Sequence, residues 1–71
     1  MQELAMKIKL RRISQNLSQN ELAEIVEMSQ QKISSIERGD MDITIKDLRQ
    51  IAKGLKVKTS WFFNEEEIQT A

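Results

Sequence analysis

Residues 18–39 read SQNELAEIVEMSQQKISSIERG, and the rest of the chain is organised around this stretch. Its first residue, Ser18, is a good helix N-cap, and Glu21 three positions later completes a capping box. Apolar residues at helical spacing then follow as far as residue 26. These signals predict a helix over residues 19–26.

A second helix follows after a connection of only two residues. Ser29 is the next N-cap, and Ile33 and Ile36 lie three apart on one face of a helix predicted over residues 30–37. Gly39 ends this helix, because glycine readily adopts the left-handed conformation that is common just past a helix end. The stretch therefore predicts two short helices joined by a tight turn.

Similar signals predict three more helices around this pair. Good helix formers fill the start of the chain, and Asn16 follows as a residue suited to the left-handed conformation. Thr44 and Asp47 form a second capping box before another apolar stripe at helical spacing. Trp61 lies in a last short segment and is expected to join the core. The predicted helices cover residues 2–15, 19–26, 30–37, 45–54 and 60–64.

The composition is that of a small globular domain, because 39% of the 71 residues are hydrophobic and 31% are charged. We expect an all-α fold, in which a compact five-helix domain covers residues 1–64, because the predicted helices are joined by short loops. An acidic, frayed tail is expected over residues 65–71.

The absence of two residue types limits the chemistry of the chain. Without cysteine and histidine there are no thiolate or imidazole metal ligands, and the usual general base is missing. We therefore expect no metal site, no other cofactor and no enzymatic activity. The lack of cysteine fits a cytoplasmic setting, and no apolar run approaches the ~18 residues of a membrane span.

The helix predicted over residues 30–37 has a face that does not suit a core. At about 100° per residue, Ile33, Ile36 and Glu37 occupy one side, which is expected to pack on the domain. The opposite side and its flanks carry hydroxyls, amides and one cation, from Gln31, Ser34, Ser35, Gln30 and Lys32. A glutamine side chain offers a donor and an acceptor that match N6 and N7 of adenine in the major groove. This face is either a reader of DNA bases or a merely solvated surface.

The charge pattern gives mixed support for DNA binding. Eleven basic and eleven acidic residues leave no net charge, whereas a basic balance is usual for such proteins. Leaving aside the three acids at residues 65–67 gives the remainder a charge of +3. Helix N-termini also attract phosphates. The residues expected at the DNA backbone or an outer base are Gln19, Ser29, Lys32, Arg38, Lys9 and Arg11.

The stretch resembles the helix-turn-helix of lambdoid phage repressors and Cro proteins, a family of bacterial regulators. The likeness covers about residues 4–63, and its strongest matches are Gln19, Leu22, Ala23, Ser29, Ile33, Ile36, Glu37 and Gly39. The resemblance implies that Gln30, Gln31 and Ser35 contact bases, and Ser34 is a further candidate because it lies on the same outward face. It also implies that Gln19 bridges the second helix to the DNA backbone or an outer base.

The same resemblance implies an ion pair between Arg12 in the first helix and Glu37 in the third. Arg12 lies on the side of its helix that carries Leu4 and Ile8, and Glu37 lies beside Ile33 on the inward side. An Arg–Glu pair is directional, so it can fix the angle of the third helix. The alternative is two ordinary surface charges.

The function implied is that of a sequence-specific, DNA-binding transcriptional regulator, most simply a repressor. A homodimer would bind a palindromic operator with the third helix of each copy in the major groove, and residues 61–63 are candidates for the dimer surface. The alternatives are an antitoxin, a restriction–modification controller, the N-terminal part of a longer repressor, or a protein-interaction module that uses the fold without DNA.

Three departures from the family pattern are expected to matter. Glu27 stands where the family usually has a turn glycine. Asp40 and Asp42 occupy a loop that is often basic, so they should repel DNA or point away from it. Lys56 and Lys58 replace a frequent glycine and serine before the last helix.

Helix 2–15 is apolar on a second side, which the family pattern does not explain. Met6, Leu10 and Ile13 lie on the face opposite Leu4 and Ile8. Three explanations remain open: the tail covers this face through Ile68, a protein partner binds it, or it is simply exposed.

Overall fold

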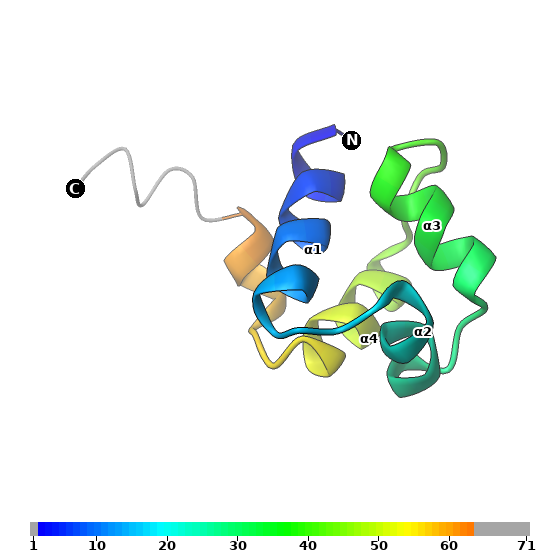
Figure 1. Ribbon diagram of the computed structural model, residues 1–71. Helices are drawn as coiled ribbons and strands as arrows, with labels where there is room; N and C mark the ends of the chain where they lie inside the picture. Colours follow the sequence, from blue (N-terminus) through cyan, green and yellow to red (C-terminus); the bar gives the residue numbers. More distant parts are fainter. Residues whose placement is uncertain (1, 64–71) are drawn as a thin grey trace.

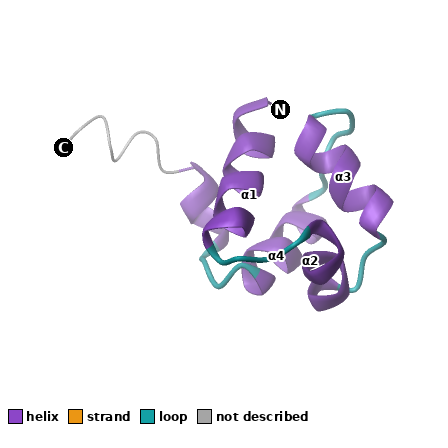
Figure 2. Ribbon diagram, viewed as in Figure 1, coloured by secondary structure: helices purple, strands orange, loops and turns teal. Residues whose placement is uncertain are grey.

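The computed structural model describes residues 2–63, which form four α-helices and one 3-10 helix (Figure 1). In chain order these are α1 (Gln2–Ser14), α2 (Gln19–Val26), α3 (Gln30–Arg38), α4 (Ile45–Gly54) and η1 (Thr59–Phe63). Figure 2 shows that the described elements are all helical and are joined by short loops. The predicted all-α fold is confirmed, although the fifth helix is a 3-10 helix. The predicted tail, with Ile68, lies outside the described residues.

The start of α2 follows from its capping box. The Ser18 hydroxyl accepts a hydrogen bond from the Glu21 N–H at 3.0 Å, and the Glu21 carboxylate accepts one from the Ser18 N–H at 2.8 Å. At α3, the Ser29 hydroxyl accepts from the Lys32 N–H at 3.1 Å. These bonds satisfy N–H groups that lack a partner within the helix, which fixes where α2 and α3 begin.

Of the two hydrogen bonds in the capping box predicted for α4, the one from the helix N–H to the threonine hydroxyl is present. The Thr44 hydroxyl accepts a hydrogen bond from the Asp47 N–H at 3.0 Å. The Asp47 carboxylate binds the ammonium of Lys32 at 2.8 Å instead of completing the box. The side chain that the sequence assigned to a local cap therefore links α4 to α3.

Four residues with left-handed backbone end or connect the helices. Asn16 and Gly39 adopt this conformation, as predicted, with φ of 60° and 75°. Glu27 and Lys56 adopt it without being glycine, with φ of 60° and 62°. Glu27 is the residue that turns the chain from α2 towards α3, so the backbone is strained at the centre of the tight turn by a residue that carries a Cβ.

The core lies where the α-helices meet. Its largest fully buried side chains come from α1, α2, α3, α4 and the residue that ends α4: Ile8, Leu22, Ile33, Leu48, Ile51 and Leu55. At one end, Phe62 of η1 is buried, whereas Trp61 is half-buried and meets it edge-on with 5.1 Å between ring centroids. Trp61 was expected to join the core, and it packs against the core from a half-buried position, while Phe62 is the aromatic residue buried within it.

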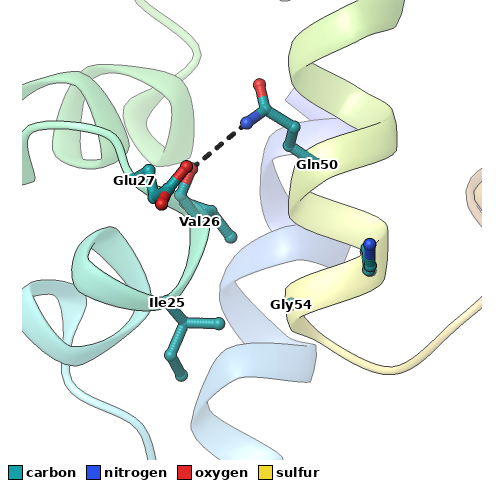
Figure 3. Close-up of a pocket in the computed structure, with 6 residues that line it drawn as sticks. Ile25, Val26, Glu27, Gln50 and Gly54 are labelled. Atoms are coloured by element: carbon teal, nitrogen blue, oxygen red, sulfur yellow. Dashed lines mark hydrogen bonds between the residues drawn. The ribbon is translucent and has the colours of Figure 1, made fainter.

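α2 packs closely on the end of α4, and a glycine makes this approach possible. A Cβ at Gly54 would lie 2.5 Å from Cγ1 of Val26, which is too near for any real contact. Figure 3 shows this crossing beside a shallow hollow, where the amide of Gln50 donates a hydrogen bond to the Val26 carbonyl at 3.4 Å. The orientation of α2 thus depends on the small size of Gly54.

Candidate nucleic-acid interface

α3 separates its apolar and polar residues as its sequence predicts. Ile33 and Ile36 are buried, and α3 packs against both α1 and α2. Gln30 and Gln31 are exposed at the start of the helix, where they meet no part of the described chain that would cover them. Figure 1 shows α3 along one edge of the molecule, with α1 to one side of it. The two amides are therefore presented to solvent on a helix whose other face is fixed.

A buried ion pair joins α3 to α1. Nε of Arg12 lies 2.7 Å from one carboxylate oxygen of Glu37, and Nη2 lies 3.1 Å from the other. The third nitrogen of Arg12, Nη1, donates to the Leu17 carbonyl at 2.6 Å. Arg12 and Glu37 are the two charged side chains that are buried among the described residues. The pair implied by the resemblance is thus present, and its two-pronged geometry fixes α3 in direction as well as position.

Gln19 completes this buried network. Its amide nitrogen donates to the same Glu37 oxygen that accepts from Nη2 of Arg12, at 3.1 Å. Sequence reasoning placed Gln19 at the DNA and did not predict this bond. The bond could have been anticipated because a buried carboxylate has more acceptor sites than one arginine fills, and it therefore needs a further donor such as an amide. Gln19 therefore ties the start of α2 to α3, so the two helices and α1 share one polar junction.

The C-terminal half of the α3 face is covered by Arg38. Its Nε lies 2.7 Å from Oδ2 of Asp40, its Nη1 lies 2.6 Å from the hydroxyl of Ser34, and its Nη2 lies 3.4 Å from that of Ser35. Both serines are half-buried, whereas Gln30 and Gln31 are open. The outward face of α3 was predicted to present amides and hydroxyls. Its N-terminal end presents the two glutamine amides, while at its C-terminal end the guanidinium of Arg38 lies over the two serine hydroxyls.

Lys32 lies in an ion pair between α3 and α4. Its ammonium is 2.8 Å from Oδ2 of Asp47, whose side chain is 14% exposed. The hydrogen bond from Lys32 lowers the pKa of the Asp47 carboxyl below its ordinary value of 3.8, and the charge of Lys32 acts in the same direction against the effect of desolvation. Lys32 was expected at the DNA backbone, and in the protein alone its charge is engaged at α4.

The two basic residues predicted at the backbone from α1 lie on different sides of the helix. They are about 160° apart around the helix, because each residue advances the helix by about 100°. Nε of Arg11 donates to the Leu55 carbonyl at 3.3 Å, so Arg11 faces the junction of α4 and η1. The structure therefore does not bring Arg11 to the α3 face. Lys9 is exposed.

The second apolar side of α1 is open within the described residues. Met6, Leu10 and Ile13 are 53%, 57% and 49% exposed. Leu10 also lines a shallow apolar hollow whose other wall includes Trp61 of η1. The apolar row on α1 is thus continuous with the surface around η1. The position of Ile68, the predicted cover, lies outside the described residues.

Residues 2–63 contain neither a metal-binding cluster of side chains nor a membrane-spanning helix. Groups of three or more carboxylates, histidines and cysteines arranged to hold a metal ion do not occur in this range. Each helix described there is too short or too polar to cross a membrane.

Helices α2 and α3, joined by a tight left-handed turn and locked to α1 by a buried ion pair, define a helix-turn-helix domain. The helix-turn-helix family model HTH_3 matches residues 8–62, and the chain belongs to this family of DNA-binding transcriptional regulators. The resemblance to phage repressors and Cro proteins is thereby confirmed.

Two relatives are longer than this chain. An uncharacterised HTH-type transcriptional regulator, y4wC, of Sinorhizobium fredii is 37% identical over 59 residues, which are 83% of this chain and 41% of the relative. An HTH_3 family transcriptional regulator from Vibrio cholerae has the same fold, with a TM-score of 0.85 and 34% identity over 94% of this chain and 38% of that protein. The chain spans about two fifths of the length of both.

A third similar protein is closer to this chain in length. The restriction-modification controller protein C.Esp1396I, solved as a tetramer with its natural 35 base-pair operator, is 35% identical with a TM-score of 0.83. The match covers 96% of this chain and 88% of the controller. Similarity to a controller thus extends over nearly its whole length.

Proposed function

We propose that this chain is a sequence-specific repressor that binds a palindromic operator as a homodimer, with α3 in the major groove. The observation that carries the proposal is the contrast between the two sides of α3. One side is fixed to the domain by Ile33, Ile36 and the Arg12–Glu37 pair. The other side presents Gln30 and Gln31 to solvent. A rigidly held helix with exposed amides suits base edges, because each amide can pair with adenine through two hydrogen bonds.

The positions proposed to contact the DNA backbone surround α3. The first turns of α2 and α3 offer N–H groups and the positive end of a helix dipole. Gln19 and Ser29 lie at these two helix starts, and Lys9 is exposed on α1. Contacts of this kind release counterions from the DNA, so binding should weaken steeply as salt rises, although the chain has no net charge.

A dimer would place two copies of α3 about 34 Å apart, one turn of the duplex. We propose that η1 and the adjoining apolar row of α1 form the dimer surface. Phe63 is 47% exposed. Leu10 of α1 and Trp61 of η1 line the same hollow, so the apolar row of α1 and the aromatic residues of η1 form one continuous surface. Repression would follow from occupancy of promoter DNA, with no chemical step.

Selection from a random-sequence DNA library, followed by gel-shift titration, tests the proposal. The wild type should enrich a palindromic site and bind it more weakly as salt is raised. Gln31→Ala should change the preferred base at one position of each half-site and cost about 1–3 kcal/mol in binding. Lys9→Ala is the matched control, and it should weaken all sequences alike. Uniform weakening by Gln31→Ala would contradict the assignment of α3.

The rival function is a protein-interaction module that uses this fold without DNA. Its support is the zero net charge and the acidic loop after α3. The same selection separates the two functions, because an interaction module would enrich no site and show no salt-sensitive binding. That result would overturn the proposal as a whole.

A second candidate within the class is a restriction–modification controller. It is favoured by the match to C.Esp1396I, which covers 88% of that controller at 35% identity. A controller gene lies near the restriction and modification genes that it regulates, whereas a repressor of other genes has no such neighbours. The sequence of the DNA that flanks the gene for this chain therefore decides between the two.

A further inference from the structure

We infer that Asp40 is a positioning residue for DNA recognition: it holds the guanidinium of Arg38 across Ser34 and Ser35, so that the C-terminal half of α3 reads guanine through arginine. The inference rests on the proposed function, because it concerns how α3 reads its site. It also gives a purpose to a carboxylate that stands where a basic loop residue would favour DNA.

The end of α3 fixes the place of Asp40. Gly39 takes the left-handed conformation, with φ of 75°, and its N–H bonds to the Ile36 carbonyl at 3.0 Å. The N–H of Asp40 bonds to the Ser35 carbonyl at 3.0 Å, one turn back along the helix. These two bonds form the usual helix-ending motif, in which the residue after glycine is folded back over the last turn. The Asp40 carboxylate is thereby held close to the side chains of α3.

The contacts of Arg38 leave its guanidinium able to read a base. A guanidinium has five N–H donors, and the three contacts to Asp40, Ser34 and Ser35 use one on each nitrogen. One N–H remains on each terminal nitrogen. Two such donors, held in one plane, match the O6 and N7 acceptors of guanine in the major groove. A serine hydroxyl alone rotates freely and selects among bases weakly.

The Asp40 contact contributes little to holding the fold together. The Arg38 and Asp40 side chains are 58% and 57% exposed, and pairs as exposed as this stabilise proteins only slightly. Asp40 also places negative charge beside the end of a helix dipole and close to the proposed DNA phosphates, and both effects are unfavourable. The effect left for the contact is geometric, since the bond from Nε to Asp40 restricts rotation of the planar guanidinium and so orients its two terminal nitrogens.

The same selection, run on four proteins, tests the inference. They are the wild type, Asp40→Ala, Asp42→Ala and Arg38→Lys. Asp42 is the matched control, because it lies in the same loop, is exposed and carries the same charge, while Arg38 pairs with Asp40. Thermal unfolding of each variant confirms that the domain is folded, as the exposure of all three residues leads us to expect.

The expected result is a guanine preference in each half-site that depends on Asp40. Asp40→Ala should reduce that preference by about 2- to 5-fold, the range of an exposed ion pair. Arg38→Lys, which keeps the charge but loses the fork, should reduce it by about 5-fold or more. Asp42→Ala should leave the preference unchanged and raise affinity for all sequences.

Three results would overturn the inference, and they differ in what they say of the proposed function. If the wild type selects a site but Asp40→Ala and Asp42→Ala have the same base preferences, Asp40 acts through its charge alone. If the wild type selects no site, the proposed function is wrong, and the positioning role of Asp40 fails with it. A guanine preference that persists in Arg38→Lys would also assign that base to another residue.

Discussion

At the scale of single residues, the support of α3 rests on one buried carboxylate. Glu37 accepts two hydrogen bonds from Arg12 and one from Gln19, and its side chain is 2% exposed. Removing one partner from such a pair strands the other charge in the interior, which costs about 3–5 kcal/mol. The pair therefore makes the orientation of the proposed reading helix sensitive to α1 and α2, and not only to the residues of the turn.

The turn between α2 and α3 is strained at one residue, and we predict that Glu27→Gly stabilises the domain. Glu27 has φ of 60° and ψ of 43°, a region that costs a residue with a Cβ on the order of 1 kcal/mol more than glycine. Urea unfolding should show a gain of about 1 kcal/mol, reduced by the greater freedom of glycine in the unfolded chain. Lys56→Gly, at φ of 62°, is a matched comparison. A loss of stability in Glu27→Gly would show that its side chain supports the turn.

How far single residues could be predicted depended on whether their role was local. The Ser18 and Ser29 caps and the left-handed Gly39 follow from signals within a few positions, and the structure contains them. The bonds of Gln19 to Glu37 and of Arg38 to Asp40 were not predicted. The first bond joins residues 18 positions apart in the chain. The second depends on which rotamer a long side chain adopts. Neither kind of contact produces a regular spacing in the sequence that could predict it.

At the scale of elements, α3 and α4 are linked by the Lys32–Asp47 pair, which gives stability a pH dependence. The hydrogen bond from Lys32 lowers the pKa of the folded-state Asp47 carboxyl below its ordinary value of 3.8. A lowered folded-state pKa adds stability above the unfolded-state value, and that contribution is lost as pH falls through the folded-state value. The loss of this stabilisation is therefore expected at pH values below about 4.

We predict that Asp47→Asn lowers the free energy of unfolding at pH 7 by less than about 1 kcal/mol, because the pair is only partly buried. Urea unfolding of wild type and variant from pH 7 to pH 2.5 should show the difference shrinking as Asp47 of the wild type is protonated. Asp42→Asn serves as the control for loss of a carboxylate outside this pair. A difference that stays constant down to the lowest pH would mean that the ionised carboxylate is not what stabilises the contact.

The helices themselves were predictable because caps and apolar spacing act within one element. α2 and α4 have the predicted bounds, α1 ends one residue earlier and α3 one residue later. The segment with three adjacent aromatics was harder, since consecutive residues in a single turn give no period that selects the buried one. Packing against α4 and the core decides it, and Phe62 is buried while Trp61 is not fully so.

At the scale of the whole molecule, the proposed DNA face and the proposed dimer surface belong to different elements. α3 carries the first, while η1 and the outer side of α1 carry the second, and the ion pair of Arg12 connects α1 to α3. A dimer formed through α1 and η1 would therefore fix the separation of two α3 helices through a rigid path. Such a path is what a palindromic operator with set half-site spacing requires.

Leu10→Glu tests this arrangement. Leu10 is 57% exposed in the middle of the apolar row, so the variant should fold normally, and a charge in an apolar interface should break the dimer. Sedimentation equilibrium should show a lower mass for Leu10→Glu than for the wild type, with an unchanged unfolding midpoint measured at low protein concentration. Lys9→Glu introduces a carboxylate at the neighbouring exposed position and should leave the mass unchanged. If Leu10→Glu alters neither mass nor stability, the apolar row is neither the dimer surface nor covered by another part of the chain.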